Sequence, residues 1–276
     1  MKADIAFGQY CEGRSFLHRL DPRWKIVFAL VYIVALFLAK NIFAFALIGL
    51  SIVGLWALSG IRAKTLIKGL RPLLFIIAFT AIINIFWFKG ETPLLPESWF
   101  FQIYLEGIIN ACLIVLRVMV LVTGTSILLT YTTTPIALTD GIEQLLAPLA
   151  KIKIPVHEFS MMMTIALRFI PTLVEETDKI MCAQKARGSD FSQGSLTRRA
   201  KALIPVLVPL FISAFRRAED LATAMECRCY TGGEGRTRMN ILHSTWRDGV
   251  MLLLLLTFTA GIVLINLYAP GYTFTM

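Results

Sequence analysis

The chain has 276 residues, of which 57% are hydrophobic and only 16% are charged, and its formal net charge is +9. This apolar excess is larger than the surface of an ordinary water-soluble domain can hold, so it excludes that class and predicts that lipid covers part of the chain. In a membrane protein the lysines and arginines report first on orientation, so the positive charge does not by itself indicate nucleic-acid binding.

Apolar runs dominate the chain outside its long central segment. The first 25 residues are charged and lack a compact apolar stretch, so we expect no cleavable signal peptide. Apolar runs then follow at 26–39, 42–58, 72–88, 107–130 and 249–268. Each has or approaches the roughly 20 residues that cross a bilayer core of about 30 Å, the shorter ones borrowing flanking residues. The sequence therefore predicts an all-α integral membrane protein with about five transmembrane helices.

Basic residues are distributed unevenly between the segments that flank these runs. Of the 27 lysines and arginines, five lie in segment 1–25, four in the loop between the second and third runs, and fifteen in segment 131–247. The positive-inside rule then places segments 1–25 and 131–247 in the cytoplasm and the C terminus outside. We expect the first four transmembrane helices over 26–130, and the last one with a C-terminal tail over 248–276.

Segment 131–247 also contains apolar stretches, but six prolines interrupt them. The longest, 203–215, would reach only about 20 Å as a helix, which is too short to span a bilayer. Apolar residues recur at helical spacing over 162–181 and 207–225, with charged residues elsewhere around each helix. This pattern predicts two long amphipathic helices that lie along a membrane or pack against partners. Two helices of an ordinary core are the alternative.

These two predicted helices end alike. The first closes with Ala-Arg-Gly at 186–188 and the second with Cys-Arg-Cys at 227–229, so that Arg187 and Arg228 lie 41 positions apart. An arginine in the last turn interacts favourably with the helix dipole by about 0.3–1 kcal/mol, and Gly188 can take the left-handed conformation that ends a helix. Each arginine could simply satisfy its own helix end. As a pair, they present two planar forks of donors suited to carboxylates in two grooves.

The remaining polar residues give little sign of catalysis. The five cysteines do not indicate a disulfide scaffold, and no nearby pair completes a zinc site. Segment 231–235 is rich in glycine but lacks the Gly-Lys-Ser/Thr ending of a phosphate-binding loop, so any ATP hydrolysis belongs to another subunit. Arg117 lies within a predicted span, where it could pair with Glu106 or a buried carbonyl, or extend toward an interface.

The chain resembles the transmembrane T component of energy-coupling factor transporters, a class of ATP-driven micronutrient importers. The resemblance covers nearly the whole length and is carried, in one-letter code, by FLHRLDPRWK at 16–25, ALRFIPT at 166–172, ARG at 186–188, AME at 224–226 and GRTR at 235–238. It implies a non-catalytic scaffold in a bacterial cell membrane, with two ATPase subunits and a small membrane-embedded S component that binds the substrate. No cofactor is implied in this chain, whereas ATP and Mg²⁺ would bind in the ATPases.

The resemblance also implies roles for particular residues. Two helix ends would dock in grooves of the two ATPases through Ala186, Arg187, Gly188, Cys227, Arg228 and Cys229. The amphipathic faces would hold the S component through Phe169, Leu173, Ile180, Leu207, Phe211, Ala214, Leu221 and Met225. Movement of the ATPases would then shift these helices and topple the S component. The second motif departs from the family pattern, because Cys227 and Cys229 replace the expected small residues around Arg228.

Two other functions remain as alternatives. A conventional ABC importer permease would build its own substrate path, but its usual glutamate-alanine-alanine and glycine coupling loop is not found. A membrane-embedded hydrolase would need several reactive groups within the spans, which offer essentially Glu106 and Arg117. The length and the basic central segment favour a shared vitamin importer over a dedicated cobalt or biotin system.

Overall fold

The computed structural model describes residues 10–13, 15–87, 104–152, 155–189, 191, 195–232 and 242–268, and every regular element in these ranges is a helix. The all-α class predicted from the sequence is thereby confirmed. Three predicted features lie wholly or partly outside these ranges: the end of the glycine-rich segment, the 235–238 motif and the tail after residue 268. The chain forms two compact units, residues 1–142 with 242–276, and residues 143–241.

The first unit contains the transmembrane helices. Four helical stretches are long and apolar enough to cross a bilayer: α2 (Ile42–Ser59), α3 (Ala63–Leu70) continued by α4 (Leu74–Trp87), α5 (Leu105–Thr125) continued by the π-helical turn Ser126–Tyr131, and α9 (Trp246–Tyr268). The first predicted span is α1 (Pro22–Leu38), whose 17 residues extend about 25 Å. It is slightly shorter than the other four stretches, so five spans remains the prediction.

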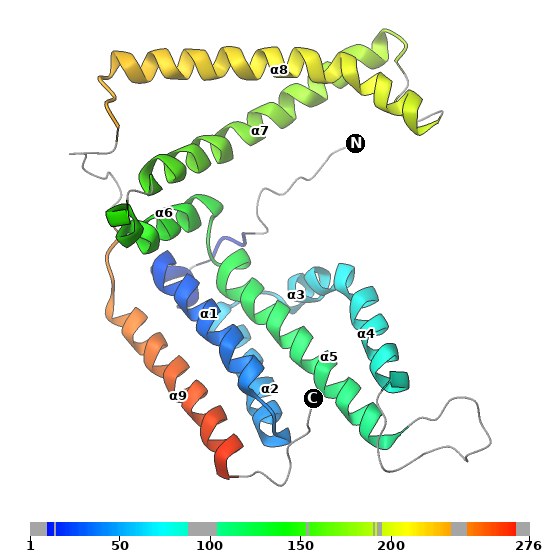
Figure 1. Ribbon diagram of the computed structural model, residues 1–276, viewed down its shortest axis with the longest axis vertical. Helices are drawn as coiled ribbons and strands as arrows, with labels where there is room; N and C mark the ends of the chain where they lie inside the picture. The colour runs from blue at the N-terminus through cyan, green and yellow to red at the C-terminus, as the bar shows by residue number, and fades with distance from the viewer. Residues whose placement is uncertain are drawn as a thin grey trace. The chain divides into compact units, whose positions relative to one another are not determined.

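The core of this unit lies between α1, α2, α5 and α9, which Figure 1 shows side by side. α1 begins after Asp21, whose carboxylate accepts a hydrogen bond from the backbone N–H of Arg23 at 3.0 Å, and Pro22 occupies its first turn. The largest core side chains come from all four helices and the π-helical turn: Phe28, Tyr32, Leu36, Phe45, Ile48, Leu113, Ile127, Leu128, Met251, Leu255 and Ile262.

Arg117 of α5 contacts the C-terminal end of α1. Its side chain is only 7% exposed, donates from Nη2 to the carbonyl of Ala39 at 2.6 Å, and lies 5.0 Å from the centre of the Phe45 ring. Asn266 of α9 donates to the carbonyl of Leu38 at 2.6 Å. Helix ends leave their last carbonyls without helical donors, so these two side chains satisfy the end of α1 inside an apolar bundle. Of the three alternatives considered for Arg117, the structure shows the bond to a buried carbonyl.

The second unit consists mainly of two long helices, α7 (Val156–Ala186) and α8 (Leu196–Cys227), and α6 (Pro135–Leu146) leads into it across the boundary at residue 142. Both helices end where predicted but begin earlier than the predicted apolar stripes, and the prolines inside them, among them Pro205 of α8, do not end them. Pro209 has no N–H to give to the Pro205 carbonyl one turn earlier, and Gln184 of α7 donates to that carbonyl at 3.4 Å. A contact between the helices thus replaces the bond that proline removes.

Candidate functional site

The end of α7 is a Schellman motif. Gly188 has φ of +87°, and its N–H bonds to the carbonyl of Lys185 at 3.0 Å. The N–H of Ser189 bonds to the carbonyl of Gln184, also at 3.0 Å. These two backbone hydrogen bonds define the Schellman motif, in which Arg187 occupies the C-cap position. The left-handed conformation predicted for Gly188 is confirmed.

The end of α8 has the same geometry with a different residue at its turning point. Cys229 has φ of +55° and its N–H bonds to the carbonyl of Glu226 at 2.8 Å, while the N–H of Tyr230 bonds to that of Met225 at 3.0 Å. Arg228 is therefore at the C-cap, as Arg187 is in α7. Cys229 takes the place of glycine, at a cost of about 1–2 kcal/mol for an L-residue in this conformation.

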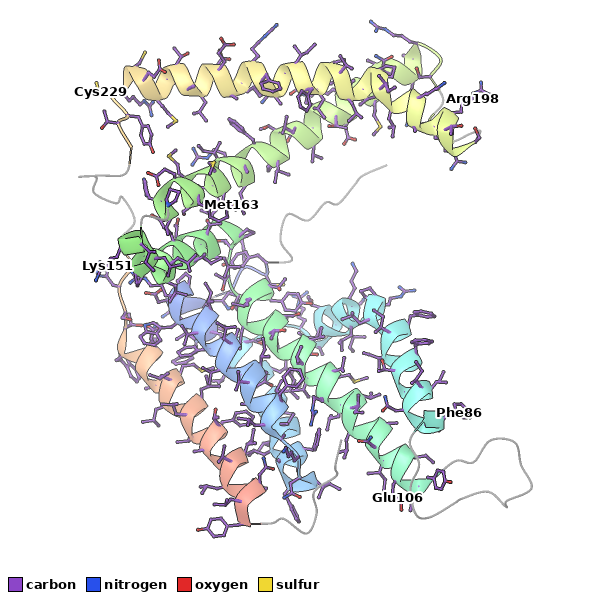
Figure 2. The ribbon with its side chains drawn as sticks, in the orientation of Figure 1. Phe86, Glu106, Lys151, Met163, Arg198 and Cys229 are labelled. Atoms are coloured by element: carbon purple, nitrogen blue, oxygen red, sulfur yellow. The ribbon has the colours of Figure 1, made fainter. Side chains whose placement is uncertain are left out.

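Both arginines lie exposed at the ends of their helices. Arg187 and Arg228 are exposed, and neither forms an ion pair with any residue in the described parts of the chain. In Figure 2, Arg198 and Cys229 mark opposite ends of α8, and α7 ends near the Arg198 end. The structure therefore brings each predicted docking motif to a helix tip, and holds the two tips apart on opposite sides of the helix pair.

The two helices are joined at their crossing by a charged pair. Arg217 of α8 donates from Nη2 to Oε2 of Glu176 in α7 at 2.6 Å. The hydroxyl of Ser213 also bonds to this carboxylate, and that bond, followed by the charge of Arg217, lowers the pKa of Glu176 below its ordinary value. The crossing is thus fixed by polar contacts that favour the ionised carboxylate.

The register of this crossing relates the two tips to each other. Glu176 and Arg217 are 41 positions apart, the same separation as Arg187 and Arg228. Each tip arginine consequently lies eleven positions, about 16 Å of helix, beyond the crossing residue of its own helix. Corresponding positions touch each other where an approximate two-fold axis relates two elements. α7 and α8 thus present two equivalent tips.

The residues predicted to hold a membrane partner differ in their exposure to solvent. Leu207 and Phe211 on α8 are 56% and 66% exposed. The other six predicted residues are intermediate in exposure: Phe169, Leu173, Ile180, Ala214, Leu221 and Met225. They lie on the two helices that contact each other, so α7 and α8 partly cover them.

The exposed apolar surface of α8 is wider than the sequence prediction. We call it the α8 apolar patch, and it consists of Leu203, Ile204, Leu207, Val208, Phe211, Ile212 and Phe215. Five of these residues were missed, because a single 3.6-residue stripe was followed from Leu207. The spacing of two adjacent i, i+4 rows, at 203–215 and 204–212, was the signal that could have identified them.

A second feature missed by sequence reasoning is a buried charged cluster at the start of α1, which we call the N-terminal anchor: Asp21, Arg23, Lys25, Thr132, Thr133 and Asp248. Lys25 is 2% exposed and donates from Nζ to the carbonyl of Thr132 at 2.9 Å and to Oγ1 of Thr133 at 3.1 Å. Asp248, also 2% exposed, accepts from the N–H of Asp21 at 3.0 Å.

Both chain segments that connect to the second unit are hydrogen-bonded within the anchor. Thr132 and Thr133 directly follow the π-helical turn on the outgoing segment. On the returning segment, Arg23 donates to the carbonyl of Leu242 at 2.9 Å, and Asp248 accepts from the N–H of Thr245 at 2.7 Å. The run 20–25, prominent in the sequence resemblance, is therefore the place where these two segments are attached to the membrane unit.

Comparisons with known proteins agree with this architecture. A family model described as cobalt transport protein, CbiQ, matches residues 13–239. The energy-coupling factor transporter transmembrane protein EcfT of Ruminiclostridium cellulolyticum is 52% identical over 267 residues, which are 96% of this chain and 98% of the relative. The protein of that name from Thermosediminibacter oceani is 53% identical over 89% of this chain and 91% of its own. The one from Bacillus subtilis is 47% identical over 94% and 97%.

These relatives align with both units, including the anchor and both helix tips. A multi-pass helical bundle and a pair of long helices with free cationic ends are suited to a subunit of a membrane transport complex. The chain therefore belongs to the CbiQ family, among the transmembrane components of energy-coupling factor transporters.

Proposed function

We propose that this chain is the scaffold subunit of an ATP-driven micronutrient importer, and that it carries motion from two ATPase subunits to a substrate-binding S component. The observation that carries the proposal is the pair of equivalent tips, each with an exposed arginine that lacks an ion-pair partner in the described chain. Arginine is the cation best suited to a carboxylate in a protein groove, because its planar fork can donate two parallel hydrogen bonds.

Two docking tips imply two partner subunits. The approximate two-fold relation of α7 and α8 suits a pair of similar ATPase subunits, one at Arg187 and one at Arg228. ATP and Mg²⁺ would bind in those subunits, and this chain would catalyse no reaction and bind no cofactor of its own. The unit that bears the tips would be cytoplasmic, as the positive-inside rule predicts from the distribution of basic residues, and the membrane would be a bacterial cell membrane.

The S component would lie against the α8 apolar patch, together with the half-buried residues predicted for this contact. Seven large apolar side chains exposed on one helix form a surface that water does not favour, and such surfaces mark contacts with proteins or membranes. We propose a vitamin as the transported substrate, the S component alone determining which one.

The N-terminal anchor would connect the motion of the second unit to the membrane helices. The second unit is connected to the bundle by two segments, and both are bonded to the start of α1. A displacement of the tips would therefore act on the membrane helices through these hydrogen bonds at the start of α1.

The test is co-purification of the tagged full chain with its two ATPases. Replacing Arg187 or Arg228 by alanine is expected to weaken docking by about 2–4 kcal/mol, the range of a buried interface anchor. The double variant should lose both ATPases, because each carboxylate groove would keep an unpaired charge. Arg198→Ala with Arg199→Ala, exposed cations at the start of α8, is the matched control and should retain both. Wild-type stoichiometry in the double tip variant would refute the proposal.

A further inference from the structure

α3 carries a row of cations on one side. Lys64, Lys68 and Arg71 follow one another at spacings of four and three residues, which places them on a common helical face. All three are exposed, and none forms an ion pair with any residue of the described ranges. The sequence has no acidic residue between Asp21 and Glu91, so α3 and the residues that flank it in sequence carry only positive charge. We call these three residues the α3 cationic stripe.

The opposite side of α3 is held against the first unit. Leu66 packs on the apolar core. Gly69 lies so close to Tyr131 that any side chain there would overlap the tyrosine hydroxyl. This close approach fixes the rotation of α3 about its own axis, because turning the helix would bring a larger residue against Tyr131. The cationic stripe is therefore directed away from the bundle by the packing of the helix.

The position of α3 relative to the bilayer follows from its charges. α3 runs into α4 through the turn Arg71–Leu73 with no intervening loop (Figure 1). Exposed lysines and arginines are costly in the hydrocarbon layer, so the stripe places α3 at the membrane–water boundary, where α4 enters the bilayer. Ile67, beside the stripe, is 68% exposed, as expected for a helix that dips an apolar edge between lipids.

We propose that the α3 cationic stripe binds the headgroup phosphates of anionic phospholipids. Successive lysines about 6 Å apart on an open face match a row of headgroups better than one soluble anion, which would require donors that converge from several sides. The adjacent Ile67 gives the acyl chains a contact that a free phosphate cannot use. This inference is independent of the proposed partners, since it concerns only the membrane unit and its lipid.

The experiment titrates the purified full chain in detergent with phosphatidylglycerol or phosphatidylcholine, and bound lipid is counted by native mass spectrometry. The wild type is expected to bind phosphatidylglycerol preferentially. Changing Lys64, Lys68 and Arg71 to glutamine should weaken that binding roughly 100-fold, since each basic residue near an anionic surface contributes about 1 kcal/mol. Phosphatidylcholine binding should be unchanged, which also shows that the variant remains folded.

Two further arms make the result decisive. The control changes Lys151, Arg198 and Arg199 to glutamine, which removes the same charge from exposed positions in the second unit, and it should leave phosphatidylglycerol binding at the wild-type level. Excess inorganic phosphate should not displace the lipid. Equal loss of binding in the control, undiminished binding in the stripe variant, or displacement by millimolar phosphate would each overturn the proposal.

Discussion

Charged side chains inside the helical bundle of the first unit differ in their surroundings from those at the helix tips of the second. In the first unit, Lys25, Asp248 and Arg117 are buried, and each is bonded to groups of the same unit. In the second unit, Arg187 and Arg228 are exposed at helix tips with no ion pair in the described chain. A charge within an apolar bundle must be satisfied by the bundle itself, whereas a charge at a tip can be satisfied by another subunit.

Apolar surface follows the same division. The first unit buries an extended core, and its outward apolar side chains face the lipid that a membrane bundle requires. The second unit has few fully buried side chains, Val156 and Val206 among them, yet it exposes the α8 apolar patch. The core of the first unit is thus stabilised by contacts within that unit, whereas the second unit exposes apolar surface that other molecules can cover.

The largest effect is expected where the first unit depends on its own charges. Lys25→Met should lower the free energy of unfolding by about 3–5 kcal/mol, because the Thr132 carbonyl and the Thr133 hydroxyl would lose their buried donor and the nearby carboxylates of Asp248 and Asp21 would lose a favourable charge. The measurement is detergent-denaturant unfolding of the purified full chain. Lys25→Met with Asp248→Asn should cost less than the sum of the two single changes, because the double variant removes both of these interacting charges.

Lys40→Met is the matched control for this cluster. Lys40 is an exposed lysine in the turn between α1 and α2, so its removal should change stability by less than about 0.5 kcal/mol. Equal stability of the Lys25 and Lys40 variants would show that the cluster is not an internal requirement of the bundle, and the contrast between the units would lose its main support.

The helix tips allow a comparison within the second unit. Gly188→Ala should destabilise the last turn of α7 by about 1–2 kcal/mol, because alanine resists the left-handed conformation. An added Cβ would meet no atom within 4 Å, so crowding plays no part. Hydrogen exchange of peptides that cover the helix end should show a loss of protection of about 5- to 30-fold. Unchanged protection would mean that the turn does not depend on glycine.

A smaller effect of opposite sign is expected at the other tip. Cys229→Gly should stabilise the end of α8 by up to about 1 kcal/mol, since glycine takes a φ of +55° without the strain of a side chain. Cys229→Ala is the control and should leave protection near the wild-type value, because alanine and cysteine share the same backbone preference. A gain with alanine as large as that with glycine would point to the thiol rather than the backbone.

These tips also show how far the sequence could lead. Gly188 could be recognised as a helix end because glycine is the usual residue there, whereas cysteine gives no such signal at 229. The apolar runs predicted the membrane helices, since their composition alone determines burial in lipid. The anchor could not be predicted, because its contacts join residues 107 and 227 positions apart in the chain. The length of α7 and α8 was also missed, as a contact between them offsets the effect of proline.

The last prediction concerns the crossing of α7 and α8, where the pair is partly exposed and a small effect is expected. The pKa of Glu176 is lowered in the folded chain by the Ser213 hydroxyl and by Arg217. A lowered pKa means that the unfolded state binds the proton more readily. The stabilisation is therefore complete above the ordinary glutamate pKa of about 4.3 and is lost as the pH falls through the lowered value.

Spin labels on the two helices should report a crossing that is constant at neutral pH and loosens only in acid. Glu176→Gln should remove this acid dependence, while Glu175→Gln, an exposed neighbour, should preserve it. Loosening at the same pH in both variants would assign the transition to other groups.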